Sequence, residues 1–85
     1  MSDEVLAMRE PTYGEKAVGL TFNPSGDQKV QKVKELYAQI IDLCLDLTTP
    51  ESDNQVCNER NRLIKISITE AQTAQMWAVK AITWK

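Results

Sequence analysis

A narrow cationic stripe is the first feature of the sequence that could carry chemistry. Its members follow one another at steps of three, four, four and seven residues, which places side chains on one side of an α-helix; they are Arg62, Lys65, Thr69, Thr73 and Lys80. Guanidinium, ammonium and hydroxyl groups in one row suit an anion such as a phosphate, above all where several copies meet around an axis. Two other interpretations stay open: a solvated helix face, or pairing with a neighbour's acidic residues such as Asp42 and Asp46.

A second group near the N-terminus combines flat apolar surfaces with cations. Its apolar members are Tyr13, Phe22 and Pro24, its cations are Lys16, Lys29 and Lys32, and Asn23 adds an amide. Bases offer π faces for stacking and phosphates need positive partners, so this mixture suits a nucleotide. Taken one at a time, each residue is typical of a structural role, with Phe22 covering a helix end and Tyr13 lying on the surface.

The residue types that catalysis usually needs are scarce. The chain has no histidine, which excludes a histidine triad, a histidine proton shuttle and the common zinc sites with histidine ligands. Cys44 and Cys57 form no CxxC motif, and Cys44 lies among helical apolar positions, where a buried, inert thiol is the ordinary role. Asp42 and Asp46 have the spacing of a solvated helix face rather than of a metal site. We expect a binding protein without catalytic residues, metal or cofactor.

Two long helices must position these groups. After the turn and capping residues 23–27, apolar residues recur at steps of three and four; they are Val30, Val33, Tyr37, Ile40, Cys44 and Leu47, widened by Leu36, Ile41 and Leu43. This spacing predicts a helix over 27–47 with a coiled-coil-like seam. Residues 48–58 form the turn and the start of the second helix, with Thr49, Ser52 and Asp53 among the candidate N-caps. Residues 59–84 contain neither Gly nor Pro, which predicts the second helix over 59–85.

The second helix has a broader apolar face than one partner helix can cover. The face consists of Leu63, Ile64, Ile68, Ala71, Ala74, Trp77, Ala78, Ala81 and Ile82. At about 100° per residue these positions span more than half of the helix circumference. Because the small alanines allow close approach, we expect a hairpin from another copy to cover the remainder. Trp77, at the edge of this face, is typical of packing, and Trp84 of an interface or a helix end.

The length and composition fit one domain, 1–85, in which 1–26 form an N-terminal arm. The arm holds all three glycines and two of the three prolines, and its stretch 15–22 is open to an extended or a helical-turn conformation. The predicted fold class is all-α: an antiparallel helical hairpin with an N-terminal arm, assembling into a homo-oligomer. The net charge of −2 is unfavourable for binding long DNA or RNA. Nothing in 1–10 marks the chain for export and no run reaches transmembrane length, so we expect a reducing, cytoplasmic compartment and no membrane partner.

Two stretches of the sequence carry a family resemblance. They are residues 14–19 together with Phe22-Asn23-Pro24, and residues 68–81, which end in Met-Trp-Ala-Val-Lys-Ala. These stretches resemble the phage anti-CBASS cyclic-nucleotide sponges, whose hairpin domain is shared with the phage sponges that counter Thoeris immunity. The resemblance implies a hexamer of helical hairpins that sequesters cyclic oligonucleotides such as cGAMP intact in the host bacterial cytoplasm. The CBASS effector is then never activated.

The resemblance also implies two kinds of ligand site. In the family, cyclic dinucleotides bind between an arm and a neighbouring protomer's helices, which implies a site at Tyr13, Gly14, Lys16, Phe22, Asn23, Pro24 and Lys29. Tyr13 matches the tyrosine that stacks on a base, while Lys16 and Lys29 are both candidates for the lysine near the phosphates. Some members also bind cyclic trinucleotides near a threefold axis, which implies a site at Arg62, Lys65, Thr69 and Thr73. The family has an arginine one turn before the threonine that matches Thr69, and Lys65 takes that position here.

A second class of function is compatible with the same residues. A non-catalytic hairpin could dock its apolar face onto the helices of another protein, with the cationic stripe merely solvated. An enzyme is disfavoured, because no nucleophile, base or metal cluster can be assembled from the residue types present.

Overall fold

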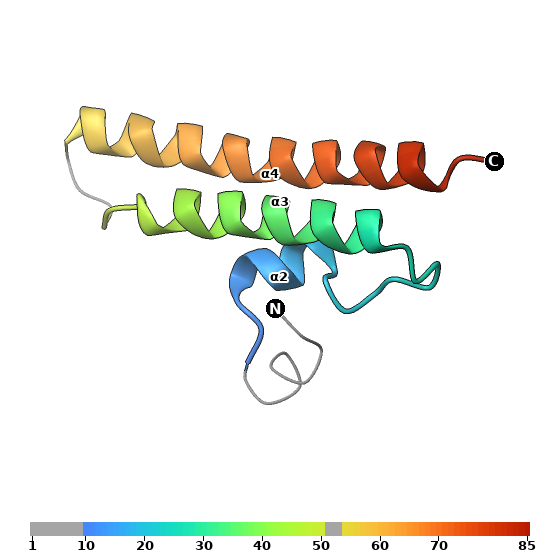
Figure 1. The fold of residues 1–85 in the computed structure, drawn as a ribbon. Helices are drawn as coiled ribbons and strands as arrows, with labels where there is room; N and C mark the ends of the chain where they lie inside the picture. The colour runs from blue at the N-terminus through green and yellow to red at the C-terminus, as the bar shows by residue number, and fades with distance from the viewer. Residues whose placement is uncertain (1–9, 51–53) are drawn as a thin grey trace.

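Three helices lie within residues 10–50 and 54–85, the part of the chain that the computed structural model describes. They are α2 (Tyr13–Val18), α3 (Gln28–Asp46) and α4 (Gln55–Thr83), and these residues contain no strand. The two long helices α3 and α4 lie side by side and antiparallel, and α2 packs on the other side of α3 (Figure 1). The prediction of an all-α hairpin preceded by an arm is confirmed. No helix in the described ranges combines the length and the apolar character that crossing a membrane requires.

Polar caps set where the two long helices begin. Asp27 and Asn54 each accept a hydrogen bond from a backbone N–H in the first turn of the helix that follows, at 2.7 and 2.9 Å. The first long helix has nearly the predicted bounds. The second begins at Gln55, where Asn54 supplies the cap, within the residues 48–58 that were predicted to hold the turn and the start of this helix. The predicted caps Ser52 and Asp53 lie outside the described residues.

Asn61 closes the connection between α3 and α4. Its amide nitrogen donates to the carbonyl oxygen of Thr49 at 2.7 Å, and its amide oxygen accepts from the backbone N–H of Thr49 at 3.1 Å. The Asn61 side chain is buried, so these bonds supply partners to polar groups that water cannot reach freely. Thr49, predicted as a helix cap, is therefore the point at which the connection is fastened to α4.

The arm stretch 15–22, whose conformation the sequence left open, is helical over 15–18 and forms a turn over 19–21. At the start of α2, the Thr12 hydroxyl accepts the Glu15 N–H at 3.1 Å and the Glu15 carboxylate accepts the Thr12 N–H at 2.8 Å. This reciprocal pair is a capping box, which stabilises a helix start. The helix ends at Gly19, whose φ of 63° lies in the left-handed region that favours glycine.

Gly14 and Asp42 hold α2 against α3. A Cβ atom on Gly14 would lie only 2.2 Å from the carbonyl oxygen of Ala38, so glycine is required for this close approach. The Asp42 carboxylate accepts the Gly14 N–H and the Thr12 hydroxyl, both at 2.7 Å. A carboxylate is favourable at a helix N-terminus. Asp42 is therefore not merely a solvated residue of the helix face, because its carboxylate holds the arm on α3.

The core lies where α3 meets the other two helices. It consists of Val18, Leu20, Ala38, Ile41, Ile64, Ile68 and Ala71. The predicted seam of α3 is only partly correct, because Ile40 and Leu47 are exposed whereas Lys34 and Ala38 are buried. The reason is α2, which packs against the flank of α3 that carries Ala38.

The other flank of α3 is apolar and uncovered. Its large side chains follow at steps of four, three and four residues and are between 45% and 64% exposed; they are Leu36, Ile40, Leu43 and Leu47. At about 100° per residue these four point away from the side of Ala38 and Asp42, where α2 lies. On α4, Ile64, Ile68 and Ala71 of the predicted apolar face are buried, but Leu63 and Trp77 are exposed. The described part of one chain thus leaves much of its apolar surface in water. We call Leu36, Ile40, Leu43 and Leu47 the apolar flank.

Candidate functional site

The arm turn, residues 19–27, leads the chain from α2 into α3 and carries three of the predicted site residues. Asn23 stabilises the turn, since its side-chain nitrogen donates to the Asp27 carbonyl at 3.1 Å and its side-chain oxygen accepts the Ser25 hydroxyl at 2.7 Å. Phe22, the residue before it, is 71% exposed. The Phe22 ring is therefore exposed to solvent beside a turn that side-chain hydrogen bonds stabilise.

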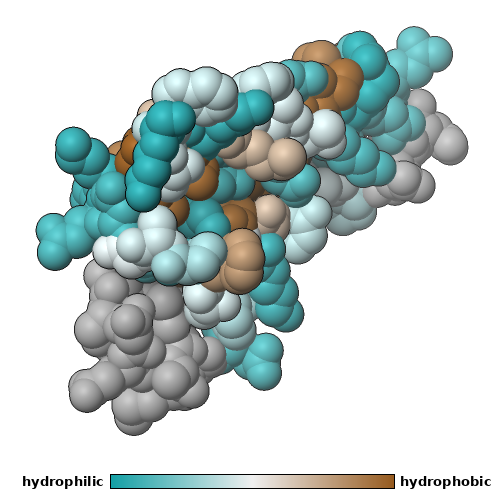
Figure 2. Space-filling view, turned by 90° about the vertical axis from the view of Figure 1, so that its right-hand side faces the viewer, coloured by the Kyte–Doolittle hydropathy of each residue, from teal (hydrophilic) through white to brown (hydrophobic). Residues whose placement is uncertain are grey.

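A hollow of about 290 Å³ lies between the arm turn and the C-terminal part of α4. It is lined by Phe22, Asn23, Pro24, Ser25, Val30, Lys34, Val79 and Thr83. The structure thus brings together Phe22, Asn23 and Pro24 of the predicted dinucleotide site and adds a wall from α4. The view onto this end of the molecule shows apolar surface set among strongly polar residues (Figure 2).

Lys34 lines this hollow and was missed in the sequence. Its ammonium donates to the carbonyl oxygens of Gly19, at 3.0 Å, and of Phe22, and it lies 5.6 Å from the centroid of the Phe22 ring. Burial lowers the pKa of the Lys34 ammonium. One signal could have revealed this residue: Lys34 stands four residues after Val30 and four before Ala38, so it is a lysine in the row of positions that α3 buries.

The other predicted dinucleotide residues lie outside the hollow. Tyr13 and Lys16 are exposed on α2, and Lys29 is exposed in the first turn of α3. Gly14 is buried against α3, where it allows the close helix contact. The Tyr13 ring therefore does not line the hollow that Phe22 lines.

The cationic stripe is exposed on α4 along its whole length, from Arg62 to Lys80. Among its hydroxyls, Thr73 donates to the Thr69 carbonyl at 3.2 Å. At its C-terminal end, the Lys80 ammonium lies 5.6 Å from the Trp77 ring centroid and 5.9 Å from that of Trp84. Both rings are exposed in the single chain, so the packing predicted for Trp77 is not satisfied within it. The Lys80 ammonium therefore already makes favourable cation–π contacts with both rings.

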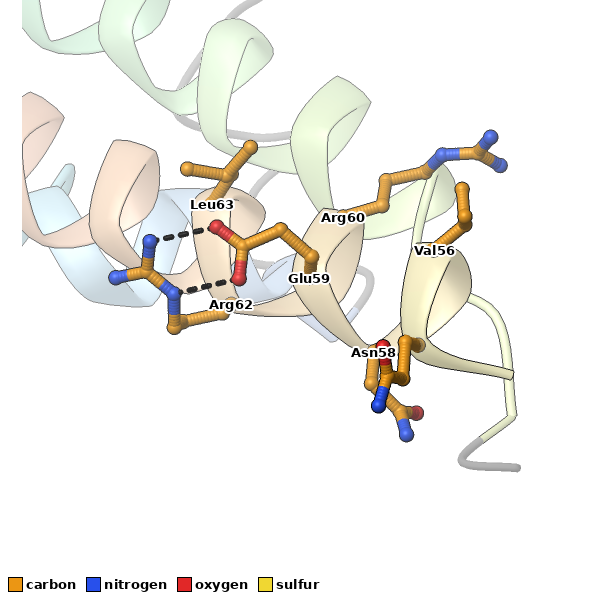
Figure 3. Close-up of a pocket in the computed structure, with 7 residues that line it drawn as sticks. Val56, Asn58, Glu59, Arg60, Arg62 and Leu63 are labelled. Carbon is orange, nitrogen blue, oxygen red and sulfur yellow. Dashed lines mark hydrogen bonds and ion pairs between the residues drawn. The ribbon is translucent and has the colours of Figure 1, made fainter. Parts of the chain in front are cut away.

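Arg62, at the other end of the stripe, is paired with Glu59. Its Nε donates to one carboxylate oxygen at 2.9 Å and its Nη2 to the other at 2.6 Å (Figure 3). Through these hydrogen bonds, the pKa of the Glu59 carboxyl is lowered and the pKa of the Arg62 guanidinium is raised. The pair borders an open depression that Val56 and Leu63 also line. An anion that approaches Arg62 must compete with Glu59.

The groups in the hollow and along the stripe suit the binding of a ligand. The hollow is lined by the Lys34 ammonium, the Phe22 ring and the Asn23 amide, which is hydrogen-bonded within the turn. The stripe carries cations and hydroxyl groups. Cys44 and Cys57 are free thiols and partly buried. Within residues 10–50 and 54–85, no group of three or more metal-ligating side chains could hold a metal ion.

Comparison with known families yields a match. A family model described as Acb2/Tad1, hairpin domain, matches residues 15–83. The match covers the arm turn, α3 and α4, and it leaves Tyr13 and Gly14 just outside. No curated protein and no solved structure matches the chain. The family resemblance carried by residues 14–24 and 68–81 is thereby confirmed.

Proposed function

Because the chain belongs to the Acb2/Tad1 hairpin family of anti-CBASS and anti-Thoeris sponges, we propose that it sequesters cyclic oligonucleotide second messengers without cleaving them. The CBASS effector of the infected bacterium then stays inactive, and the protein acts in the host cytoplasm. The family match over residues 15–83 carries this proposal, since it includes both long helices and the arm turn. Members of this family act as binding sponges rather than as enzymes.

Cyclic dinucleotides are the first proposed ligands, and the arm is their proposed site. Such a ligand carries two stackable bases and two phosphodiester charges. The arm region offers the exposed rings of Tyr13 and Phe22 and the exposed cations of Lys16 and Lys29. Nanomolar binding corresponds to about −12 kcal/mol, whereas stacking supplies about 1–3 kcal/mol per base. Phosphate contacts and the exclusion of water must supply the rest, which favours a site closed by a neighbouring copy.

The proposed assembly is a hexamer of hairpins. Its support is the apolar flank, whose four large side chains are half exposed or nearly so in one chain, together with the exposed Leu63 and Trp77 on α4. Apolar surface of this extent is typical of an interface. Assembly would also bring the arm of one copy close to the helices of another, where an open hollow becomes an enclosed site.

Cyclic trinucleotides are the second proposed ligands, with Arg62, Lys65, Thr69 and Thr73 as their site. All four residues are exposed on one side of α4, which supports a row that faces a common axis. The pairing of Arg62 with Glu59 works against this site, because each copy must give up an ion pair before its guanidinium can meet a phosphate. We expect weaker binding here than at the arm.

Calorimetric titration of the purified protein with cyclic dinucleotides, cyclic trinucleotides and cyclic ADP-ribose isomers tests the proposed function. We expect tight binding of at least one cyclic oligonucleotide, and chromatography of the released ligand should find it unchanged. Tyr13→Ala should weaken dinucleotide binding without dissolving the oligomer, while Tyr13→Phe, which keeps the ring, should bind as the wild type does. Absence of binding to every compound in the set contradicts the sponge function.

A protein-interaction module is the second candidate, favoured by the same apolar flank. In this case the flank docks onto a different protein, and the cationic stripe is only solvated. Sedimentation analysis separates the two candidates: a stable homo-oligomer supports the sponge, whereas a monomer that gains order only with a protein partner supports the module.

A further inference from the structure

Lys34 is a buried cation whose charge is not matched within the described part of the chain. Its side chain is 5% exposed and lies in the row of buried positions on α3. Among the described residues, its ammonium makes no ion pair with a carboxylate, and its partners are the carbonyl oxygens of Gly19 and Phe22. Two neutral acceptors satisfy two of the three N–H donors of an ammonium but bring no counter-charge.

Burial without a counter-charge makes the site receptive to an anion. Removing a charged group from water costs free energy, and here the same burial lowers the pKa of the Lys34 ammonium. An anion beside the ammonium offsets that cost by Coulombic attraction, which is stronger in partly buried surroundings than in water. Exposed lysines such as Lys29 and Lys32 are hydrated already and gain less from an anion.

The hollow beside Lys34 has the shape and lining for part of a nucleotide. Its volume of about 290 Å³ is bounded by the arm turn and by Val79 and Thr83 of α4, which is close to the lower end of the volumes of small-molecule sites. The Phe22 ring lies 5.6 Å from the Lys34 ammonium and is itself largely exposed. One ring face is therefore near the cation, and much of the ring remains open to a stacking partner.

We propose that Lys34 is a phosphate-binding residue of this protein and that one phosphodiester group of a cyclic oligonucleotide enters the hollow against its ammonium. This inference rests on the proposed sponge function. It adds a buried cation to the proposed site, in which Lys16 and Lys29 are exposed. Lys34 also fastens the arm turn to α3 through Gly19 and Phe22. Phosphate binding at Lys34 and the position of the Phe22 ring are thus coupled.

Two measurements on the full chain test the proposal. In the first, cyclic di-AMP, cyclic di-GMP and cGAMP are titrated into the wild type, Lys34→Met and Lys32→Met. Met keeps an unbranched stem, and Lys32 is an exposed lysine of the same helix, so the two variants lose the same charge. Loss of a charged hydrogen bond predicts an affinity about tenfold or more lower for Lys34→Met, and a change within about twofold for Lys32→Met.

The second measurement needs no variant and separates phosphate binding from a structural role. The ¹⁵N resonance of the Lys34 ammonium is followed in the wild type while the tightest-binding cyclic dinucleotide is added. We expect this resonance to shift on saturation while that of Lys32 stays in place. An unmoved Lys34 resonance, or Lys34→Met binding as tightly as the wild type, overturns the role of Lys34 and leaves the sponge function intact. Failure of the wild type to bind any cyclic oligonucleotide overturns both.

Discussion

Replacing Gly14 by alanine tests whether the arm is held on α3 by close packing. The added methyl carbon would lie 2.2 Å from the carbonyl oxygen of Ala38, 2.9 Å from its carbonyl carbon and 2.8 Å from a carboxylate oxygen of Asp42. Two of these three atoms belong to the backbone of α3, which cannot rotate away as a side chain can. The α2 helix must therefore withdraw from α3, and its withdrawal breaks the bond between the Gly14 N–H and Asp42.

Three effects determine how much Gly14→Ala changes the free energy of docking the arm on α3. Overpacking of a well-packed contact costs about 1–3 kcal/mol, and loss of a hydrogen bond to a charged group costs about 1.5–3 kcal/mol. The third effect offsets part of these two costs, because the intrinsic helix propensity of alanine exceeds that of glycine by about 1 kcal/mol. The net cost to arm docking is about 1.5–5 kcal/mol, which shifts the docking equilibrium roughly 10- to 5000-fold toward the detached arm.

Amide hydrogen exchange measures this shift directly. In Gly14→Ala, the amides of Lys16 and Leu20, which bond to the carbonyls of Thr12 and Glu15, should exchange faster in proportion to the detached population. Amides in the middle of α4 should keep their protection, and cyclic dinucleotide affinity should fall because the arm no longer forms one wall of the hollow.

Gly26→Ala is the matched control for this experiment. Gly26 has a φ of 64° and no atom within 4 Å of an added Cβ, so alanine there meets backbone strain of about 1–2 kcal/mol but no clash. It should perturb the arm turn while leaving exchange within α2 nearly unchanged. Unchanged or slower exchange of residues 15–20 in Gly14→Ala refutes the packing argument.

Three further predictions concern the hairpin itself. Glu59→Gln should free the Arg62 guanidinium and tighten binding of cyclic trinucleotides in calorimetry; unchanged trinucleotide binding would leave the stripe as a solvated face. Asn61→Leu removes the amide that pairs with buried backbone groups of the connection and should cost about 1–3 kcal/mol, seen as a fall of roughly 4–8 °C in Tm per kcal/mol; an unaltered Tm contradicts that role. Leu43→Lys should lower the sedimentation mass of the assembly, whereas Leu45→Lys, an exposed leucine on another side of α3, should preserve it; equal behaviour of the two would exclude the apolar flank as the interface.

The long helices could be read from the sequence because their signals are local. Apolar residues at steps of three and four, together with capping side chains, act within a few residues of the chain and predicted 27–47 and 59–85 closely. The start of α4 at Gln55 lies within the predicted 48–58, but its exact position could not be chosen because several polar residues there compete as caps. The contact between Asn61 and Thr49 fixes where the turn is attached. That contact depends on how the two helices align.

The buried side of α3 could not be read from the sequence in the same way. The spacing favoured Ile40 and Leu47 as seam residues, yet α2 selects the flank that carries Ala38. This selection depends on Gly14 and Asp42, which are 28 residues apart in the chain. A lone glycine and a lone aspartate carry no periodic signal, so their partnership appears only in three dimensions.

In the candidate site, too, the features that depend on neighbouring residues could be predicted, and those that depend on residues far away in the sequence could not. Phe22, Asn23 and Pro24 are adjacent in sequence, and the turn over 23–27 was predicted from its residue types. Lys34 was missed because a lysine within an apolar row is usually read as an interruption of it, while its partners lie in a segment whose position depends on α2. Site residues whose partners lie far away in the sequence therefore give no periodic signal by which they could be predicted.

The distribution of unmatched charge favours the hollow over the stripe as the place where a phosphate binds most tightly. Arg62 is already bound to Glu59, so an anion at that end of the stripe must break an ion pair before it can bind. Lys34 instead has carbonyl partners and no counter-charge among the described residues. An anion in the hollow adds an attraction without first breaking an ion pair, so we expect dinucleotide binding at the arm to survive salt concentrations that abolish binding at the exposed stripe.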